Sequence, residues 1–193
     1  MNTTPPSARL VQALARRRVP LGFLAGALVL WLSQPTPSTL VAGTAVAMVG
    51  ELLRIWAAGH LNKAREVTTS GPYRWFAHPL YVGSSIMGVG LALVADRVAV
   101  TAIIGLYLVM TLMAAVRSEE AFLRHAFGER YDRYRRGVDA VRGDDAEERR
   151  FHVARVIANR EHRALVGLGI AILLLALKAT YNSGSLWRAT GRP

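Results

Sequence analysis

The fold of this chain is decided by residues 79–116, which read PLYVGSSIMGVGLALVADRVAVTAIIGLYLVMTLMAAV. Asp96 and Arg97 are the only charged residues in this stretch, and they separate two apolar runs at 79–95 and 98–116. A helix needs about 20 mostly apolar residues to cross the hydrocarbon core of a bilayer, within a range of about 17–25. Two such helices joined by two residues must lie antiparallel and side by side. The stretch therefore predicts a transmembrane hairpin.

Three further apolar runs flank this hairpin, at 19–36, 40–59 and 164–181. We therefore predict an all-α, polytopic integral membrane bundle of about five transmembrane helices, formed by residues 1–193 as a single membrane domain. A cytoplasmic, amphipathic helical segment at 117–163 separates the fourth span from the fifth. The first run follows three arginines, as a signal peptide would, but no small-residue cleavage site comes after it, which favours an uncleaved span.

The positive charge of the chain fits this topology. The 193 residues include 24 Lys and Arg against 13 Asp and Glu, and the formal net charge is +11. Most of these cations fall in segments that are cytoplasmic if the N-terminus is cytoplasmic, in agreement with the positive-inside rule. We therefore expect membrane lipids, and no nucleic acid, as partners. The prediction is an integral protein of the cytoplasmic membrane with its N-terminus and active site facing the cytoplasm.

Metal and thiol chemistry find no support in the sequence. The chain has no cysteine, which excludes disulfides, thiolate metal sites and a cysteine nucleophile. Its five histidines are scattered and form no H-x-x-x-H pair. We therefore predict no metal site.

One ion pair is expected inside a span. Glu51 and Arg54 are three residues apart in the second run, so they share a helix face and can pair. Ionisable residues within a membrane helix are costly and usually face protein or water, which makes this pair a functional candidate. The alternative is that both side chains reach water at the cytoplasmic interface.

Two polar blocks lie at the ends of the predicted hairpin. The first is GPYRWFAHPLYVG at 71–83, in which Pro79 suits the first turn of a helix and places His78 at its N-cap, where backbone N–H groups favour an anion. The second is RSEE at 117–120, whose carboxylates accept hydrogen bonds from hydroxyl or ammonium groups. The hairpin brings both blocks to the same membrane surface. A pocket between them suits a zwitterionic ligand that carries a ribose and a sulfonium.

Each of these features also has an ordinary structural explanation. A His and a Tyr at a membrane interface commonly anchor a helix there, and a pair of glutamates is commonly solvated. Gly83, Gly88 and Gly90 allow close contact between helix backbones in lipid, and they equally allow a ligand to approach a backbone. The combination of the two blocks is what favours a functional site.

The order and spacing of these blocks resemble the isoprenylcysteine carboxyl methyltransferase family and, more distantly, the phosphatidylethanolamine N-methyltransferases. The family pattern is GPY-x(4)-HP-x-Y-x-G, a hairpin, R-x-E-E and F-G-x-x-Y-x-x-Y; here it reads GPYRWFAHPLYVG and RSEEAFLRHAFGERYDRY. The resemblance covers about residues 51–138. It implies an integral-membrane methyltransferase that uses S-adenosylmethionine and methylates a lipophilic acceptor such as an isoprenylcysteine carboxylate.

The resemblance also implies roles for the matched residues. Arg117 and Glu120 would be catalytic. Residues that would bind S-adenosylmethionine are His78, Tyr81, Gly83, Gly88, Gly90, Glu119 and Glu120. The chain departs from the family at Ala77, where an arginine is usual, and in the RRGVDAVRGDD stretch and further span that follow the last tyrosine.

Two other functions remain open. An NADPH-dependent membrane reductase of the sterol-reductase type carries related H-P-x-Y blocks, but RSEE followed by FGERYDRY favours methyl transfer. A non-catalytic membrane scaffold or transporter is favoured by the alanine at position 77. For a methyltransferase, a prenylated cysteine carboxylate, a lipid amine and a small hydrophobic acid are all candidate acceptors.

Overall fold

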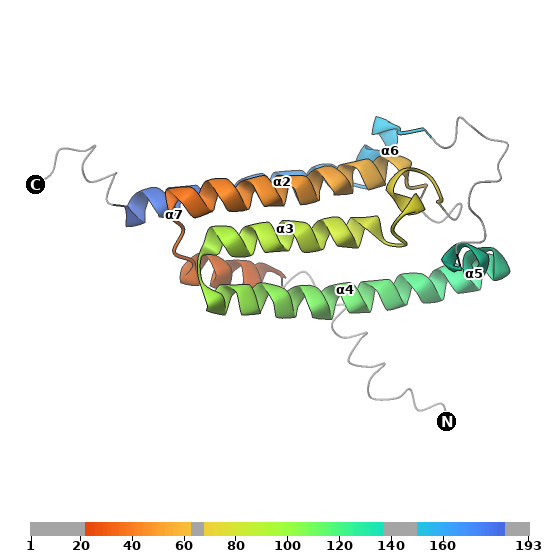
Figure 1. Cartoon of the computed structure of the whole chain (residues 1–193), viewed down its shortest axis with the longest axis horizontal. Helices are drawn as coiled ribbons and strands as arrows, with labels where there is room; N and C mark the ends of the chain where they lie inside the picture. Colours follow the sequence, from red (N-terminus) through yellow and green to blue (C-terminus); the bar gives the residue numbers. More distant parts are fainter. Residues whose placement is uncertain (1–21, 63–67, 137–149, 184–193) are drawn as a thin grey trace, which may run out of the picture.

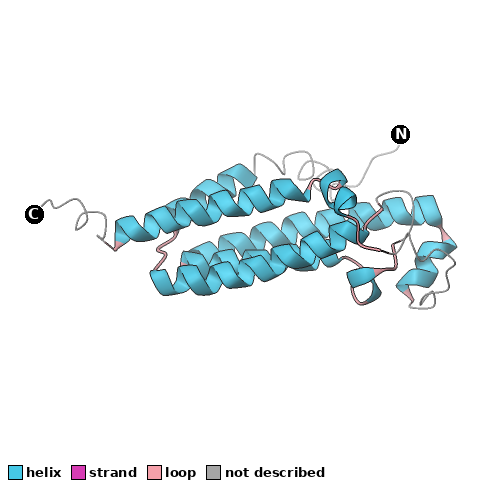
Figure 2. Cartoon of the chain, turned by 90° about the horizontal axis from the view of Figure 1, so that it is seen from above, coloured by secondary structure: helices cyan, strands magenta, loops and turns pink. Residues whose placement is uncertain are grey.

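The computed structural model describes residues 22–62, 68–136 and 150–183, and these ranges contain helices and loops but no strand (Figures 1 and 2). The elements in chain order are a helix Gly22–Leu32, α2 Pro37–His60, the 3-10 turn η1 Gly71–Arg74, α3 Pro79–Ala95, α4 Val98–Phe127, α5 Glu129–Arg135, α6 Val153–Ala158 and α7 Glu161–Asn182. Each of the five runs predicted as spans overlaps one helix, and α2, α4 and α7 extend beyond the predicted runs.

Three of the helices are long and apolar enough to cross a membrane: α2 with 24 residues, α4 with 30 and α7 with 22. The helix Gly22–Leu32 and α3, which has 17 residues, are apolar but shorter. At 1.5 Å per residue α3 is about 26 Å long, close to the ~30 Å of a hydrocarbon core. The predicted helical membrane fold is confirmed, and the number of helices that cross the bilayer stays a prediction.

Local signals set the ends of the helices. Thr36 caps α2, since its side chain accepts a hydrogen bond from the Thr39 N–H while the Thr39 hydroxyl accepts one from the Thr36 N–H, at 3.2 and 3.0 Å. α4 runs past the predicted end of its span at residue 116, because neither glycine nor proline interrupts AVRSEEAFLRHAF. Gly128, with φ 49°, ends it. The RSEE block therefore lies on a helix rather than on a loop.

Glycines bring α2 and α3 into backbone contact along their length (Figure 1). A Cβ atom added to Gly50 would lie 2.5 Å from the Met87 nitrogen and 2.6 Å from the Gly83 carbonyl oxygen. One added to Gly90 would lie 2.6 Å from the carbonyl oxygen of Gly43. Such distances are shorter than any real Cβ contact, so only glycine fits. This is the packing that small residues permit between helices in lipid.

α4 packs much more loosely. Asp96 makes the turn of the hairpin in the left-handed conformation, with φ 51°, and α4 then runs back along α3. Gly88 of α3 faces the Leu108 side chain of α4. Along the rest of α4 large apolar side chains such as Leu106 are exposed, which fits a helix surrounded by lipid.

The C-terminal elements pack against α2. In Figure 1, α7 lies behind α2 and α6 lies at the end of α2 formed by His60. The apolar side chains of Val153 and Ile157 on α6 are exposed, while Asn159, just after it, bonds to α2. This agrees with the amphipathic character predicted for part of segment 117–163; residues 137–149 of that segment lie outside the described ranges.

The glycine contact predicts that a glycine-to-alanine substitution destabilises the protein at the contact between α2 and α3 but not on the exposed surface of α4. We expect Gly90→Ala to lower the stability of the purified protein by about 1–3 kcal/mol, because two backbones must move apart. The matched control is Gly105→Ala on α4, where an added Cβ meets no atom within 4 Å. Alanine favours a helix over glycine by about 1 kcal/mol at both positions, so the control should melt at or above the wild-type temperature. Thermal unfolding in detergent measures both, and equal melting temperatures for the two variants would contradict the prediction.

Candidate functional site at the meeting of α3 and α4

The first half of the site is the turn that leads into α3. His78 is the N-cap of α3 and Pro79 is its first residue. The N–H groups of a first helical turn have no partner within the helix, so a proline, which lacks an N–H, is tolerated there. Its ring also disfavours helical backbone at His78, so the helix begins at Pro79. The N–H groups of Tyr81 and Val82 donate to the His78 carbonyl oxygen at 3.0 and 3.2 Å, which closes the first turn. The rings of His78 and Tyr81 lie together, with centroids 5.6 Å apart.

The second half of the site comes from α4. The Tyr81 hydroxyl donates to Glu119 Oε2 at 2.7 Å. His78 Nε2 lies 3.4 Å from Glu120 Oε1, and its Nδ1 lies 3.8 Å from Glu119 Oε2. We call these four residues, His78, Tyr81, Glu119 and Glu120, the site cluster. The prediction that the two ends of the hairpin meet is confirmed.

The site cluster is accessible from outside the bundle. It lies where the start of α3 meets α4, and α3 starts on the right in Figure 1, at the same end of the bundle as α5 and α6. Side-chain exposure is 37% for Glu119, 19% for Glu120 and 14% for His78. A carboxylate offers about four lone-pair sites, so both glutamates keep the capacity to accept hydrogen bonds from a ligand. The arrangement is acidic, partly open and bordered by two rings.

Four other residues predicted for the site lie differently. The Arg117 side chain is exposed and makes no hydrogen bond or ion pair with another residue in the described ranges. Gly83 and Gly90 face α2, and Gly88 faces α4. The structure thus gives the three glycines a packing role, and the cofactor-binding role expected for them stays a prediction.

Sequence reasoning missed one contact next to the site cluster. The Arg54 guanidinium donates through Nη1 to the Leu80 carbonyl oxygen at 3.5 Å and to the Ser84 hydroxyl, and through Nη2 to Glu161 Oε2 at 2.7 Å. Leu80 and Ser84 lie in the first turns of α3, beside Tyr81. The Glu51–Arg54 pair was predicted and is present, at 3.4 Å. Nothing in the sequence indicates Glu161 as a partner, because it lies 107 residues away.

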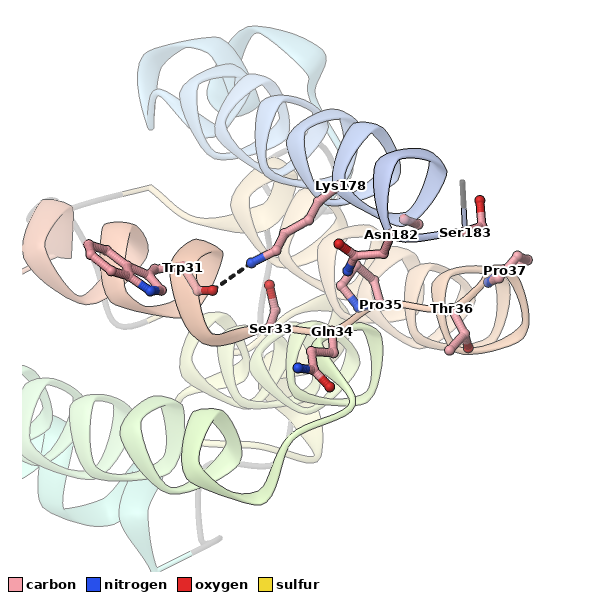
Figure 3. A pocket seen from close by; sticks show the side chains of 10 residues that line it. Trp31, Ser33, Gln34, Pro35, Thr36, Pro37, Lys178, Asn182 and Ser183 are labelled. Atoms are coloured by element: carbon pink, nitrogen blue, oxygen red, sulfur yellow. Dashed lines mark hydrogen bonds between the residues drawn. The ribbon is translucent and has the colours of Figure 1, made fainter. Parts of the chain in front are cut away.

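A pocket of about 450 Å³ lies at the other end of the bundle, where α2 begins and α7 ends. It is lined by residues such as Trp31, Gln34 and Asn182 (Figure 3). The Lys178 ammonium group beside it donates to the backbone oxygens of Leu30 and Trp31, at 2.6 and 2.5 Å. This pocket includes no residue of the site cluster. Within the described ranges, no group of three or more His, Cys, Asp or Glu residues could hold a metal ion.

Known proteins resemble the chain over the part that contains the site cluster. Residues 38–130 match the family model "Phospholipid methyltransferase". A nickel-cobalt-cadmium resistance protein of Alcaligenes xylosoxydans is 33% identical over 112 residues, which is 57% of this chain and 51% of the relative. A cobalt-zinc-cadmium resistance protein of Cupriavidus metallidurans is 35% identical over 101 residues, 51% of this chain and 45% of the relative.

A third relative is an enzyme. The protein-S-isoprenylcysteine O-methyltransferase of Schizosaccharomyces pombe is 30% identical over 95 residues, which is 49% of this chain and 40% of the relative. The chain thus spans about half the length of the curated relatives it matches. No solved structure matches it. Residues 38–130 therefore match the phospholipid methyltransferase family, and the resemblance inferred from the two polar blocks and their spacing is confirmed.

Proposed function

We propose that the chain is an integral-membrane methyltransferase that uses S-adenosylmethionine and methylates a lipophilic acceptor, with an isoprenylcysteine carboxylate as the first acceptor to test. The observation that carries this proposal is the site cluster, in which Tyr81 of α3 bonds to Glu119 of α4 inside the segment that matches the family. The isoprenylcysteine methyltransferase relative supports the same chemistry.

The residues of the site cluster fit the chemical groups of S-adenosylmethionine. This compound supplies an activated methyl group on a positively charged sulfur, together with an ammonium group, a carboxylate and two ribose hydroxyls. Glu119 and Glu120 are partly exposed acceptors suited to the ammonium and hydroxyl groups. The N-terminal turn of α3 favours the carboxylate, and His78 and Tyr81 border the space with their rings. The two carboxylates also favour a positively charged group at the site cluster itself.

The work of the protein in such a reaction is to bind and orient. Holding two reactants in line removes much of the entropic barrier of a two-molecule reaction, and no covalent intermediate with the protein is required. In this proposal Arg117 orients an anionic acceptor. It is two residues before Glu119 on α4, and its charged side chain is exposed. The exposed apolar surface of α4, which includes Val109 and Met113, supports an approach of the acceptor from the lipid.

The alternatives have weaker support. The family model that residues 38–130 match is a methyltransferase model, which favours methyl transfer over a membrane reductase that uses NADPH. A non-catalytic scaffold is distinguished by whether the chain binds S-adenosylmethionine at all. Two relatives are named as metal resistance proteins, and no observation in the described ranges adds a metal-binding role to this chain.

Cofactor binding tests the proposal directly. We expect Glu120→Ala to weaken binding of S-adenosylmethionine at least tenfold, because hydrogen bonds to charged groups contribute about 1.5–3 kcal/mol and tenfold in affinity is about 1.4 kcal/mol. Isothermal titration calorimetry on the protein in detergent gives the Kd. The matched control is Glu129→Ala, an exposed acidic residue of α5. Unchanged affinity in the Glu120 variant would count against the assignment, and a wild-type protein that does not bind would refute the proposed function.

A separate test addresses the proposed orientation, in which the site cluster faces the cytoplasm. Because the chain has no cysteine, an introduced cysteine is its only thiol. Single cysteines are introduced as Ser38→Cys at the start of α2 and as Asp132→Cys on α5, two positions at opposite ends of the bundle with exposed side chains. In intact bacterial cells, a membrane-impermeant maleimide should label position 38, and it should label position 132 only after lysis. The reverse pattern would place the site cluster on the outer face of the membrane.

A further inference from the structure

A charged cluster is buried between α2, α3 and α7, next to the site cluster but not part of it. Arg54 is at its centre, with Nε 3.4 Å from Glu51 Oε2 and Nη2 2.7 Å from Glu161 Oε2. Side-chain exposure is 0% for Glu51, 8% for Glu161 and 16% for Arg54. We call these three residues the arginine cluster. The alternative that Glu51 simply reaches interfacial water does not hold, because water has no access to it.

The remaining nitrogen of Arg54 contacts the start of α3. Nη1 donates to the Leu80 carbonyl oxygen at 3.5 Å and to the Ser84 hydroxyl, which itself donates to the same carbonyl at 2.9 Å. Gly83 makes room for this approach, since a Cβ added there would lie 2.7 Å from Arg54 Cγ. Arg54 thus connects a carboxylate on α7 to the turn of α3 that carries Tyr81.

Glu161 is held in place independently of Arg54. It is the first residue of α7, and α6 immediately before it is fixed to the C-terminal end of α2. Asn159 Nδ2 donates to the Ala58 and Leu61 carbonyl oxygens at 3.0 and 3.1 Å. Both carbonyls lie at the C-terminal end of α2, where regular helical hydrogen bonds stop, and the Ala58 carbonyl also accepts the Leu61 N–H at 3.3 Å. Arg160, which lies between Asn159 and Glu161 in the sequence, has a left-handed φ of 60° that few non-glycine residues adopt. Such a conformation persists where the surrounding structure fixes the backbone.

We propose that the arginine cluster positions the first turn of α3, and that Glu161 of α7 is thereby a positioning residue for the site cluster. The guanidinium contacts three elements through three different nitrogens, a geometry that a lysine ammonium group cannot reproduce. α7 lies outside the segment at residues 38–130 that matches the family. This chain therefore supplies part of the support for its site from its own C-terminal helix. The expected effect on cofactor binding and turnover rests on the proposed function, whereas the positioning of α3 does not.

A small displacement of α3 has a large effect in this geometry. Tyr81 and Glu119 meet across two helices that otherwise pack loosely, so their 2.7 Å hydrogen bond depends on where the first turn of α3 lies. If Arg54 loses its charged partner on α7, the guanidinium is left buried with incomplete compensation and must move. The reactive groups of a transfer reaction tolerate little misplacement, since about 1 Å can cost a hundredfold in rate.

The test compares two substitutions, each of which removes one polar contact between α7 and the rest of the bundle. Glu161→Gln removes the charge that faces Arg54 and keeps the shape of the side chain. Lys178→Met removes the tie at the opposite end of the same helix, from the Lys178 ammonium group to the Leu30 and Trp31 carbonyls. Melting temperature, the Kd for S-adenosylmethionine and turnover of a small isoprenylcysteine carboxylate are measured for both. We expect Glu161→Gln to weaken cofactor binding or lower turnover at least tenfold and Lys178→Met to leave both within about twofold.

A readout without any ligand keeps this inference separate from the proposed function. Histidine labelled with ¹³C at Cε1 gives one resonance for each of the five histidines, and His78 is assigned by its loss in His78→Gln. We expect the His78 resonance to shift in Glu161→Gln and to remain in place in Lys178→Met. If the wild-type protein binds no S-adenosylmethionine but these shifts occur, the proposed function fails and the positioning role stands.

Two further variants guard against simple misfolding. Glu161→Asp keeps the charge and should retain most of the cofactor affinity. In a protein that already carries Arg54→Met, Glu161→Gln should change neither the His78 resonance nor the Kd any further, because the two residues act through one contact. The inference is overturned if Glu161→Gln leaves both readouts at wild-type values, or if Lys178→Met changes them to the same extent.

Discussion

The backbone contact between α2 and α3 is the interaction on which the rest of the structure depends. In lipid no hydrophobic effect drives helices together, so close packing of small residues must hold them. Gly50 and Gly90 provide this packing at two levels of the contact. The same closeness lets Arg54 on α2 reach the carbonyl oxygen of Leu80 on α3. The glycines therefore determine which polar groups can meet as well as how tightly the helices pack.

α4 stands in contrast to this rigid pair. It contacts α3 through few side chains, among them Leu108 at Gly88, and most of its surface is exposed along the apolar part. Its polar end nevertheless reaches the start of α3, where Glu119 accepts the hydrogen bond of Tyr81. Because α4 continues as a helix to Phe127, its two glutamates are fixed relative to its apolar part. One rigid helix thus joins a surface suited to lipid with carboxylates suited to a polar ligand.

Much of this arrangement follows from the sequence. Hydropathy places the helices, the two charged residues of the hairpin define its turn, and the dipeptide His78–Pro79 marks the start of α3, so the meeting of the two polar blocks is a geometric consequence. The role of the glycines does not follow from the sequence, because a glycine permits the close approach of a second helix and of a ligand equally well. The sequence also predicts that Glu51 and Arg54 pair, since they are one turn apart. It contains no signal for Glu161, because the partner of a buried charge on another helix is set by tertiary packing.

The arrangement of polar groups answers a problem that any membrane enzyme with one polar and one lipophilic reactant must solve. Charged side chains are costly inside the bilayer, so a site for a polar ligand belongs where helices end, and this is where Glu119 and His78 meet. Helix ends are also the least restrained part of a bundle, since the last turns lack neighbours on one side. A buried arginine that joins three helices just inside that end counters this freedom. Its desolvation cost is offset by the 2.7 Å charged hydrogen bond to Glu161. The rigidity of the site is thus obtained from the helix interior rather than from the exposed residues that contact the ligand.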